Sequence, residues 1–113
     1  MKKIEAIIKP SKLSNVKESL HEIGLSGMTV SDVKGFGRQR GQDQGLNNSP
    51  DYDDEFRVKI KIELIIEDKL IDNALEAIKN AAYSGKIGDG KIFIYTIDQV
   101  IRIRTGEKGS DAV

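Results

Sequence analysis

The chain has 113 residues, which suits one domain with a modest hydrophobic core. It carries 18 basic and 18 acidic residues, no cysteine and a single histidine. The lack of cysteine excludes a disulfide framework and thiolate catalysis, and one histidine does not supply a zinc site of the usual kind. The balanced charge argues against a nucleic-acid-binding protein, because such proteins usually present a net basic stripe to the phosphates.

No apolar run approaches the roughly 20 residues that a membrane-spanning helix needs. Near the N-terminus, Glu5 and Lys9 interrupt the apolar stretch that a signal peptide would require. We therefore expect a soluble, cytoplasmic protein with no direct membrane insertion and no nucleic-acid partner.

The first third of the chain predicts a strand, a helix and a second strand. Apolar and charged residues alternate over 3–9, which indicates a half-buried strand that Pro10 ends. Ser11 is a candidate N-cap for a helix whose apolar residues recur at helical spacing until Gly24. Residues 28–34 contain threonine and valines and predict the second strand.

The same order of elements returns after a long interruption. Alternation over 58–64 is the cleanest strand pattern in the sequence, with Lys59 as an outward-facing residue. Asp68 is a candidate cap for a helix with one apolar face over 71–82. Residues 92–97 predict the last strand.

Two βαβ units of similar length in one domain spanning 1–113 predict an α+β, ferredoxin-like double βαβ fold. Right-handed crossovers would place both helices on one face of the sheet. The other face would be bare, with Ile7 and Ile65 pointing towards it. A bare apolar face predicts self-association.

The segment between the two units, at about 37–57, is rich in glycine, asparagine and acidic residues and has little periodicity. Structureless loops longer than roughly 12–15 residues are usually functional or disordered. This one joins two strong strand patterns. We therefore expect a long mobile arm that a ligand positions and a protein partner reads.

Residues 85–92 fit the pattern G-x-x-x-x-G-K, but Ile92 stands where a P-loop needs serine or threonine. The segment also follows a helix and precedes a strand, so we reject a Walker motif. Closely spaced glycines still allow backbone N–H groups to converge on an anion beside Lys91. The alternative interpretation is a plain glycine-rich turn.

Two further segments carry cations. Arg102 and Arg104 alternate with isoleucines, so both guanidinium groups would project from one face of an extended segment and bind a polyphosphate. The alternative is a solvated edge strand whose charges deter aggregation. Residues 34–41 mix glycines with cations, which indicates either an anion nest or a flexible strand exit. A ferredoxin-like trimer would bring such loops and termini together at its subunit clefts.

Over nearly its whole length the chain resembles the PII nitrogen-regulatory proteins. The segments that carry the resemblance are MKKIEAIIKP (1–10), GMTV (27–30), KGFGRQ (34–39), GKIGDGKIF (85–93) and VIRIRTGE (100–107). The resemblance implies a homotrimer with three clefts between subunits, in which ATP and ADP compete. In many members it also implies 2-oxoglutarate sensing through a Mg²⁺ ion on the ATP phosphates.

By matching positions, the resemblance also assigns residues to sites. Arg102 and Arg104 would reach the phosphates from the neighbouring subunit. The other nucleotide-binding residues would be Thr29, Gly35, Gly37, Arg38, Gln39, Ile65, Gly88, Asp89, Gly90 and Lys91. The 2-oxoglutarate site would comprise Gln39, Gly41, Lys59, Ile87 and Gly88, with Gln39 completing the Mg²⁺ shell and Lys59 pairing with a carboxylate.

The loop departs from the family pattern. It is one residue longer and reads NNSPDY over 47–52, followed by further acidic residues. Tyr52 stands at the place of a modified tyrosine, but the arginine that can plug an ammonium channel is absent. Tyr83 replaces an arginine that is common before the glycine-rich segment. The departures in the loop disfavour uridylylation of Tyr52 and control of an ammonium channel, and Tyr83 removes one possible phosphate contact.

We therefore expect a regulator rather than an enzyme. It would bind ATP or ADP, with Mg²⁺ beside ATP, and control a transporter, an enzyme or a transcription factor through its loop. The alternative is a PII-like adenylate sensor insensitive to 2-oxoglutarate, or a slow ATPase in which Asp53 or Asp54 orients a water. A scaffold without a ligand is disfavoured, because clustered cations are costly without an anion. A C-terminal tail is expected from about residue 105.

Overall fold

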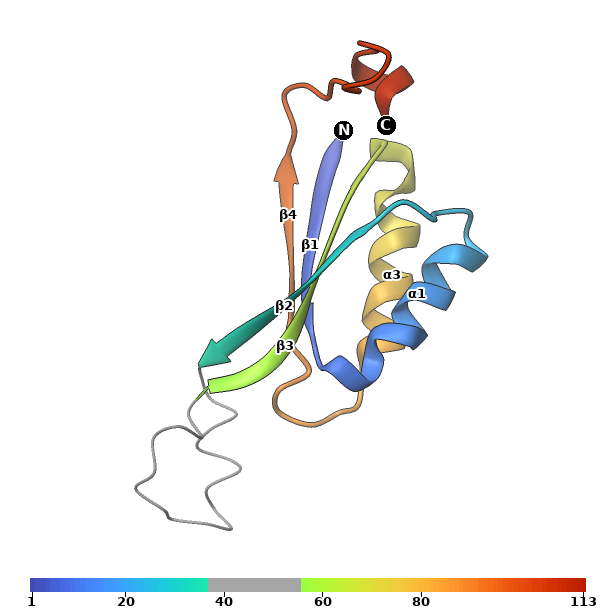
Figure 1. Cartoon of the computed structure of the whole chain (residues 1–113). Helices are drawn as coiled ribbons and strands as arrows, with labels where there is room; N and C mark the ends of the chain where they lie inside the picture. Colours follow the sequence, from blue (N-terminus) through green and yellow to red (C-terminus); the bar gives the residue numbers. More distant parts are fainter. Residues whose placement is uncertain (37–55) are drawn as a thin grey trace.

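One antiparallel sheet has its strands in the order β2-β3-β1-β4 (Figure 1). The computed structural model describes residues 1–36 and 56–113. The strands are β1 (Lys2–Ile8), β2 (Thr29–Phe36), β3 (Phe56–Ile66) and β4 (Lys91–Thr96). β1 is central and pairs with β3 and β4, while β2 pairs with β3 at one edge. This topology confirms the predicted ferredoxin-like fold.

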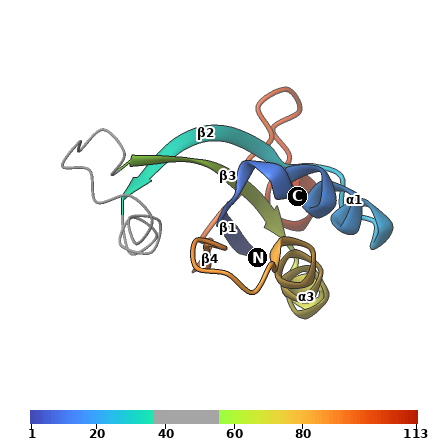
Figure 2. The same ribbon diagram turned by 90° about the horizontal axis from the view of Figure 1, so that it is seen from below.

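Helices α1 (Leu13–Glu22) and α3 (Ile71–Ala82) pack side by side on one face of the sheet, as predicted (Figure 2). Alternating apolar side chains of β1 and β3 point into this layer, because successive residues of a strand face opposite sides. The buried core consists of Ile4, Ala6, Ile8, Val16, Leu20, Ile60, Ile62, Leu64, Ile66, Ala74, Ile78 and Ala82. Within 1–36 and 56–113, no helix is long and apolar enough to span a bilayer.

The two predicted side-chain caps were wrong. Each helix is entered through a short 3-10 turn, η1 (Pro10–Lys12) or η3 (Asp68–Leu70), and the candidate cap lies in that turn rather than at the start of the helix. Ser11 lies inside η1, and no side chain caps α1. Asp68 instead forms an ion pair with the N-terminal ammonium of Met1 at 2.9 Å.

The C-terminal end of α1 follows the prediction. Gly24 has a φ of 88°, a left-handed conformation that favours glycine. Its N–H donates to the carbonyl of His21 at 2.9 Å, and the N–H of Leu25 donates to the carbonyl of Leu20 at 2.9 Å. These bonds satisfy carbonyls that the helix leaves open and turn the chain towards β2.

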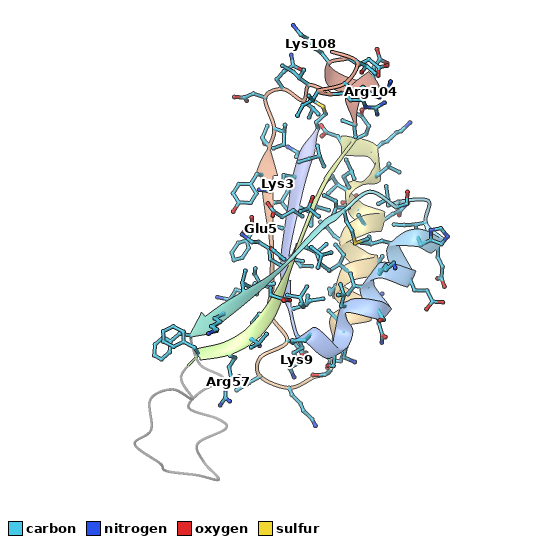
Figure 3. The ribbon with its side chains drawn as sticks, viewed as in Figure 1. Lys3, Glu5, Lys9, Arg57, Arg104 and Lys108 are labelled. Atoms are coloured by element: carbon cyan, nitrogen blue, oxygen red, sulfur yellow. The ribbon has the colours of Figure 1, made fainter. Side chains whose placement is uncertain are left out.

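The sheet face away from the helices carries Ile7 and Ile65, as predicted, but it is not a bare apolar surface. Glu5 lies directly opposite Glu63 in the register of β1 and β3. Such a like-charge pair is unfavourable unless a cation offsets it. The Lys3 Nζ lies 2.7 Å from the Glu63 carboxylate and 3.5 Å from Glu5, and Figure 3 shows Lys3 and Glu5 on this face. The face is amphipathic, and its two facing glutamates share the cation of Lys3.

Candidate functional site

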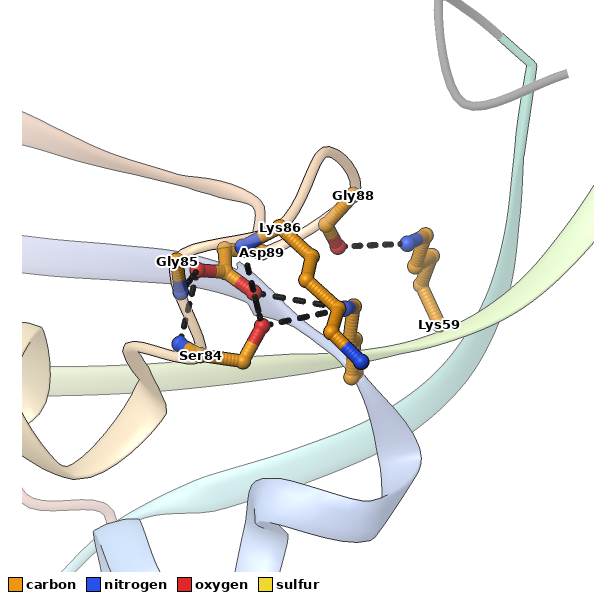
Figure 4. Close-up of polar contacts among 7 residues, drawn as sticks. Lys59, Ser84, Gly85, Lys86, Gly88 and Asp89 are labelled. Carbon is orange, nitrogen blue, oxygen red and sulfur yellow. Dashed lines mark hydrogen bonds and ion pairs between the residues drawn. The ribbon is translucent and has the colours of Figure 1, made fainter. Parts of the chain in front are cut away.

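The glycine-rich segment between α3 and β4 folds around the carboxylate of Asp89 (Figure 4). The carboxylate accepts hydrogen bonds from the N–H of Ser84 at 2.8 Å, the N–H of Gly85 at 3.0 Å and the hydroxyl of Ser84. It also lies 3.3 Å from the ammonium group of Lys9. Burial raises the pKa of Asp89, but these donors outweigh burial and hold the pKa well below its usual range.

Glycines let this segment, the glycine loop (residues 85–90), lie against the sheet. Gly90 has a φ of 102°, and a Cβ there would lie 1.7 Å from the carbonyl oxygen of Ile7 in β1. No other residue fits that approach without a shift of the backbone. Gly88 also has a positive φ, of 100°. The glycines therefore allow the loop to contact β1, in addition to any role in binding a ligand.

Lys59 occupies a different environment from the one predicted. It is on the sheet face away from the helices but is only 8% exposed, and its Nζ donates to the carbonyl of Gly88 at 2.8 Å. The predicted face of the strand is therefore correct, but the side chain is not solvated, because the glycine loop comes back across this end of β3. Gly35 in β2 lies beside Lys59, so that a Cβ added to this glycine would lie 3.5 Å from the Lys59 Cγ. Three predicted site residues, Gly35, Lys59 and Gly88, therefore lie together.

Thr29 and Ile65 form a second group, at the far end of β2 and β3 from Gly35. Thr29 pairs with Glu63 across the two strands, whereas Gly35 pairs with Arg57. The hollow that Thr29 and Ile65 share is completed by Lys3, Gly27, Met28, Glu63 and Leu64.

Arg102 and Arg104 form a third group, and the predicted extended segment was wrong. The chain reverses here: the N–H of Arg102 donates to the carbonyl of Glu107 at 2.9 Å, and the N–H of Gly106 donates to the carbonyl of Arg102 at 2.8 Å. Gly106 permits the reversal with a φ of 74°. The alternating pattern imitated a strand, but the reversal leaves Ile103 99% exposed at the tip. The edge-strand alternative was wrong for the same reason.

The three groups lie at separate places on one chain. Figure 3 shows Lys9 and Arg57 at one end of the sheet and Arg104 and Lys108 at the other. The glycine loop is at the Lys9 end, and Lys91, which begins β4, is exposed there. Ile87 of the glycine loop is 47% exposed. A single chain therefore does not gather the predicted nucleotide-binding residues in one cleft.

Part of the predicted site lies outside the described residues. These residues are Gly37, Arg38, Gln39, Gly41, Tyr52, Asp53 and Asp54, together with most of the expected arm at about 37–57. Phe56 and Arg57 belong to β3. The expected tail from about 105 includes the end of the reversal and a 3-10 turn, η4 (Gly109–Ala112).

Sequence reasoning missed the residues that support the glycine loop. Lys9 and Ser84 hold Asp89, yet neither was assigned to a site: Lys9 lies in the 1–10 segment without a role, and Ser84 directly precedes the glycine-rich segment. The one indication for Lys9 was its place at the end of a strand, where the topology brings it beside the next loop. Phe36 and Phe56 were also missed. They pair across β2 and β3 where the described strands end, with ring centroids 5.6 Å apart.

A family profile for "Nitrogen regulatory protein P-II" matches residues 1–107. The chain belongs to the nitrogen regulatory protein P-II family. The predicted resemblance is thereby confirmed, and the P-II assignment makes the chain a signal-transduction regulator rather than an enzyme.

Relatives support the P-II assignment over the full length. The chain is 61% identical to the nitrogen regulatory protein P-II of Rhodospirillum rubrum and 57% identical to that of Azospirillum brasilense, each over 113 residues and 100% of both chains. Among solved structures, Arabidopsis thaliana PII bound to citrate superposes with a TM-score of 0.81 at 37% identity. That match covers 99% of this chain and 91% of the plant chain.

Proposed function

We propose that this P-II family member is a homotrimer that binds ATP or ADP in the clefts between its subunits. The bound nucleotide would be reported to a protein partner through the segment between β2 and β3. The single observation that carries the proposal is the separation of the cationic groups. Arg104 lies at the opposite end of the sheet from Lys9, which contacts the glycine loop (Figure 3). Arg102 belongs to the same reversal as Arg104, and Lys91 begins β4 next to the glycine loop. A polyphosphate would meet both groups only where two chains adjoin.

The chemistry of the exposed groups supports an anionic ligand. Arg102, Arg104 and Lys91 are exposed cations. Guanidinium groups bind phosphate oxygens in pairs of parallel hydrogen bonds, and an ammonium group adds a point charge. The side chain of Arg102 also lies 3.3 Å from Glu107, which holds it near the reversal.

The amphipathic sheet face supports self-association. Ile7 and Ile65 lie on this face, and Phe93 and Tyr95 of β4 are 43% and 45% exposed. Burying these side chains against a second chain would remove apolar surface from water, while the Lys3–Glu63 ion pair remains satisfied within each chain.

Mg²⁺ fits the proposed site only as a companion of ATP. Within residues 1–36 and 56–113, no three carboxylate or histidine side chains gather to hold a metal ion. Mg²⁺ is commonly bound through substrate phosphates and few protein ligands. Gln39 would be the protein ligand of Mg²⁺. The ion would also bind 2-oxoglutarate, whose carboxylate would pair with Lys59. This finer part of the proposal predicts that 2-oxoglutarate binds more tightly when Mg-ATP is present.

The proposal is tested by calorimetric titration of ATP and ADP into the purified protein, with its mass measured by light scattering. We expect a trimer and saturable binding of both nucleotides. Replacing Arg104 by alanine should weaken ATP binding at least about tenfold, since hydrogen bonds to charged groups contribute about 1.5–3 kcal/mol.

The matched control is Lys17→Ala, which removes one exposed positive charge on α1. It should leave the affinity unchanged. If millimolar ATP and ADP give no heat of binding and no change in melting temperature, nucleotide binding is refuted. If Arg104→Ala binds ATP with the same affinity as the parent, the role assigned to Arg104 is refuted.

A further inference from the structure

Both oxygens of the Asp89 carboxylate are already used inside the protein. Oδ2 accepts the N–H groups of Ser84 and Gly85, at 2.8 and 3.0 Å. Oδ1 accepts the hydroxyl of Ser84 and lies 3.3 Å from the ammonium of Lys9. An ionised carboxylate only accepts hydrogen bonds, so it offers a phosphate group no donor. The hydrogen bonds of the Asp89 carboxylate therefore differ from those of a residue that binds phosphates directly.

Lys9, Ser84 and Asp89 form a closed cluster, which we call the latch. Lys9 Nζ donates to the Ser84 hydroxyl at 3.2 Å, so each member contacts the other two. The members come from three places in the chain: directly after β1, two residues after the end of α3 and two residues before the start of β4. The latch thus ties both ends of the glycine loop to the rest of the fold (Figure 4).

Gly88, the neighbour of Asp89 in the chain, is held by a separate contact. Gly88 precedes Asp89, and its carbonyl accepts the hydrogen bond from the buried Lys59. Lys59 belongs to β3 and adjoins Gly35 at the end of β2. On the other side of Asp89, Gly90 lies against the backbone of Ile7. The backbone of the glycine loop is therefore fixed on both sides of Asp89.

We propose that Asp89 is a positioning residue of the nucleotide site. In this proposal the latch holds the backbone of residues 86–90 in the conformation that receives the phosphates, and the Asp89 carboxylate itself makes no contact with them. The inference rests on the proposed function, because its consequence for affinity requires that nucleotide binds beside the glycine loop. Preorganised loops bind more tightly because less ordering remains to be done on binding.

Electrostatic repulsion and the latch predict opposite effects of Asp89→Asn on the affinity for nucleotide. A negative charge beside a phosphate site repels the ligand, so neutralising Asp89 without other change would strengthen nucleotide binding. The latch predicts weaker binding instead, because asparagine offers one acceptor oxygen where aspartate offers two. The direction of the change in the Kd for ATP therefore separates the two explanations.

The first experiment measures the Kd for ATP at 25 °C for the folded parent and for Asp89→Asn, Ser84→Ala, Lys9→Met and Lys9→Arg. We expect the first three variants to bind about three- to tenfold more weakly and Lys9→Arg to stay close to the parent, because arginine retains the charge. In Lys9→Met with Asp89→Asn, the two losses should not multiply, since both break the same cluster.

Tighter or unchanged binding by Asp89→Asn would overturn the proposal, as would independent effects of Lys9→Met and Asp89→Asn. A purely structural role would lower the melting temperature of these variants and leave the Kd of the folded protein unchanged. That result would also count against the proposal.

The second experiment needs no nucleotide, so it separates failure of the latch from failure of the proposed function. Amide hydrogen exchange is compared between the free parent and free Asp89→Asn. We expect exchange at residues 84–91 to be at least about tenfold faster in the variant, with α1 unchanged. Faster exchange limited to Ser84 and Gly85 would show that Asp89 does not position Gly88. If the parent binds no ATP, nucleotide binding fails, while the exchange result still decides whether the latch orders the loop.

Discussion

At the scale of residues, partners distant in sequence decide what a side chain does. Asp89 belongs to a glycine-rich motif and was assigned to phosphate binding by resemblance. Its partner Lys9 is far away in the sequence, and only the fold brings the two within 3.3 Å. Lys59 was expected to face outwards, yet the Gly88 carbonyl covers its ammonium group. Local patterns indicate which face of a strand a residue occupies, but not which distant loop returns to that face.

The depressed pKa of Asp89 makes a prediction about stability and pH. A carboxyl whose pKa is lower in the folded than in the unfolded state stabilises the fold above its unfolded pKa and loses that contribution as the pH falls below it. Asp89 has an ordinary value of 3.8 and a lowered folded value. We expect Asp89→Asn to lower the free energy of unfolding by roughly 1–3 kcal/mol at about pH 6.

This difference between parent and variant should shrink as the pH falls below about 4, measured by urea unfolding. Glu63 and Asp68 also have lowered pKa values, but they are common to both proteins and cancel in the difference. Asp98→Asn, which alters an exposed carboxyl, serves as the control. A difference that stays constant from pH 6 to pH 3, within about 0.3 kcal/mol, would contradict the assignment of the latch.

At the scale of elements, periodicity predicted the strands and helices well, because burial of one face is a local property of the pattern. β1 and β4 differ from the predicted ranges by a residue at each end, and β3 extends further than predicted, to Phe56–Ile66. The caps failed because the 3-10 turns precede the helices. The segment around Arg102 failed because alternation alone does not distinguish a strand from a reversal that Gly106 permits.

The close contact between the glycine loop and β1 is possible only because residue 90 is a glycine and has no Cβ. In Gly90→Ala the new Cβ would lie 1.7 Å from the carbonyl oxygen of Ile7, and the backbone would keep a φ of 102°. We expect the free energy of unfolding to fall by at least about 2 kcal/mol, because strain and overlap act together. Gly27→Ala is the matched control, since its Cβ would meet nothing within 4 Å, and it should stay within about 0.5 kcal/mol of the parent.

At the scale of the whole molecule, the fold divides the candidate site residues into three separate groups. Sequence alone indicated the cationic groups, and the fold separated them along the sheet. The fold class followed from the order of elements. The division of the site into three groups did not, because it depends on the register of β2 with β3 and on the reversal after Val100.

An intersubunit site predicts complementation between two defective variants. Lys91→Ala damages the glycine-loop side of a cleft, and Arg104→Ala damages the arginine side. In trimers mixed at random in equal amounts, about a quarter of the clefts would combine two intact halves, because each cleft takes its sides from different subunits. Calorimetry should detect ATP sites of parental affinity in the mixture and none in either variant alone. A mixture that binds no better than its components would show that each site is built within one chain.

The Phe36–Phe56 pair also offers an optical probe. The chain contains no tryptophan, so a single indole would be the sole source of tryptophan emission. Both rings are more than half exposed, at 55% and 57%, and they join the two strands that border the segment 37–55. Phe56→Trp would therefore place a fluorophore where the segment 37–55 ends and β3 begins. Its emission would follow, in real time and without a label, how that junction changes when nucleotide is added.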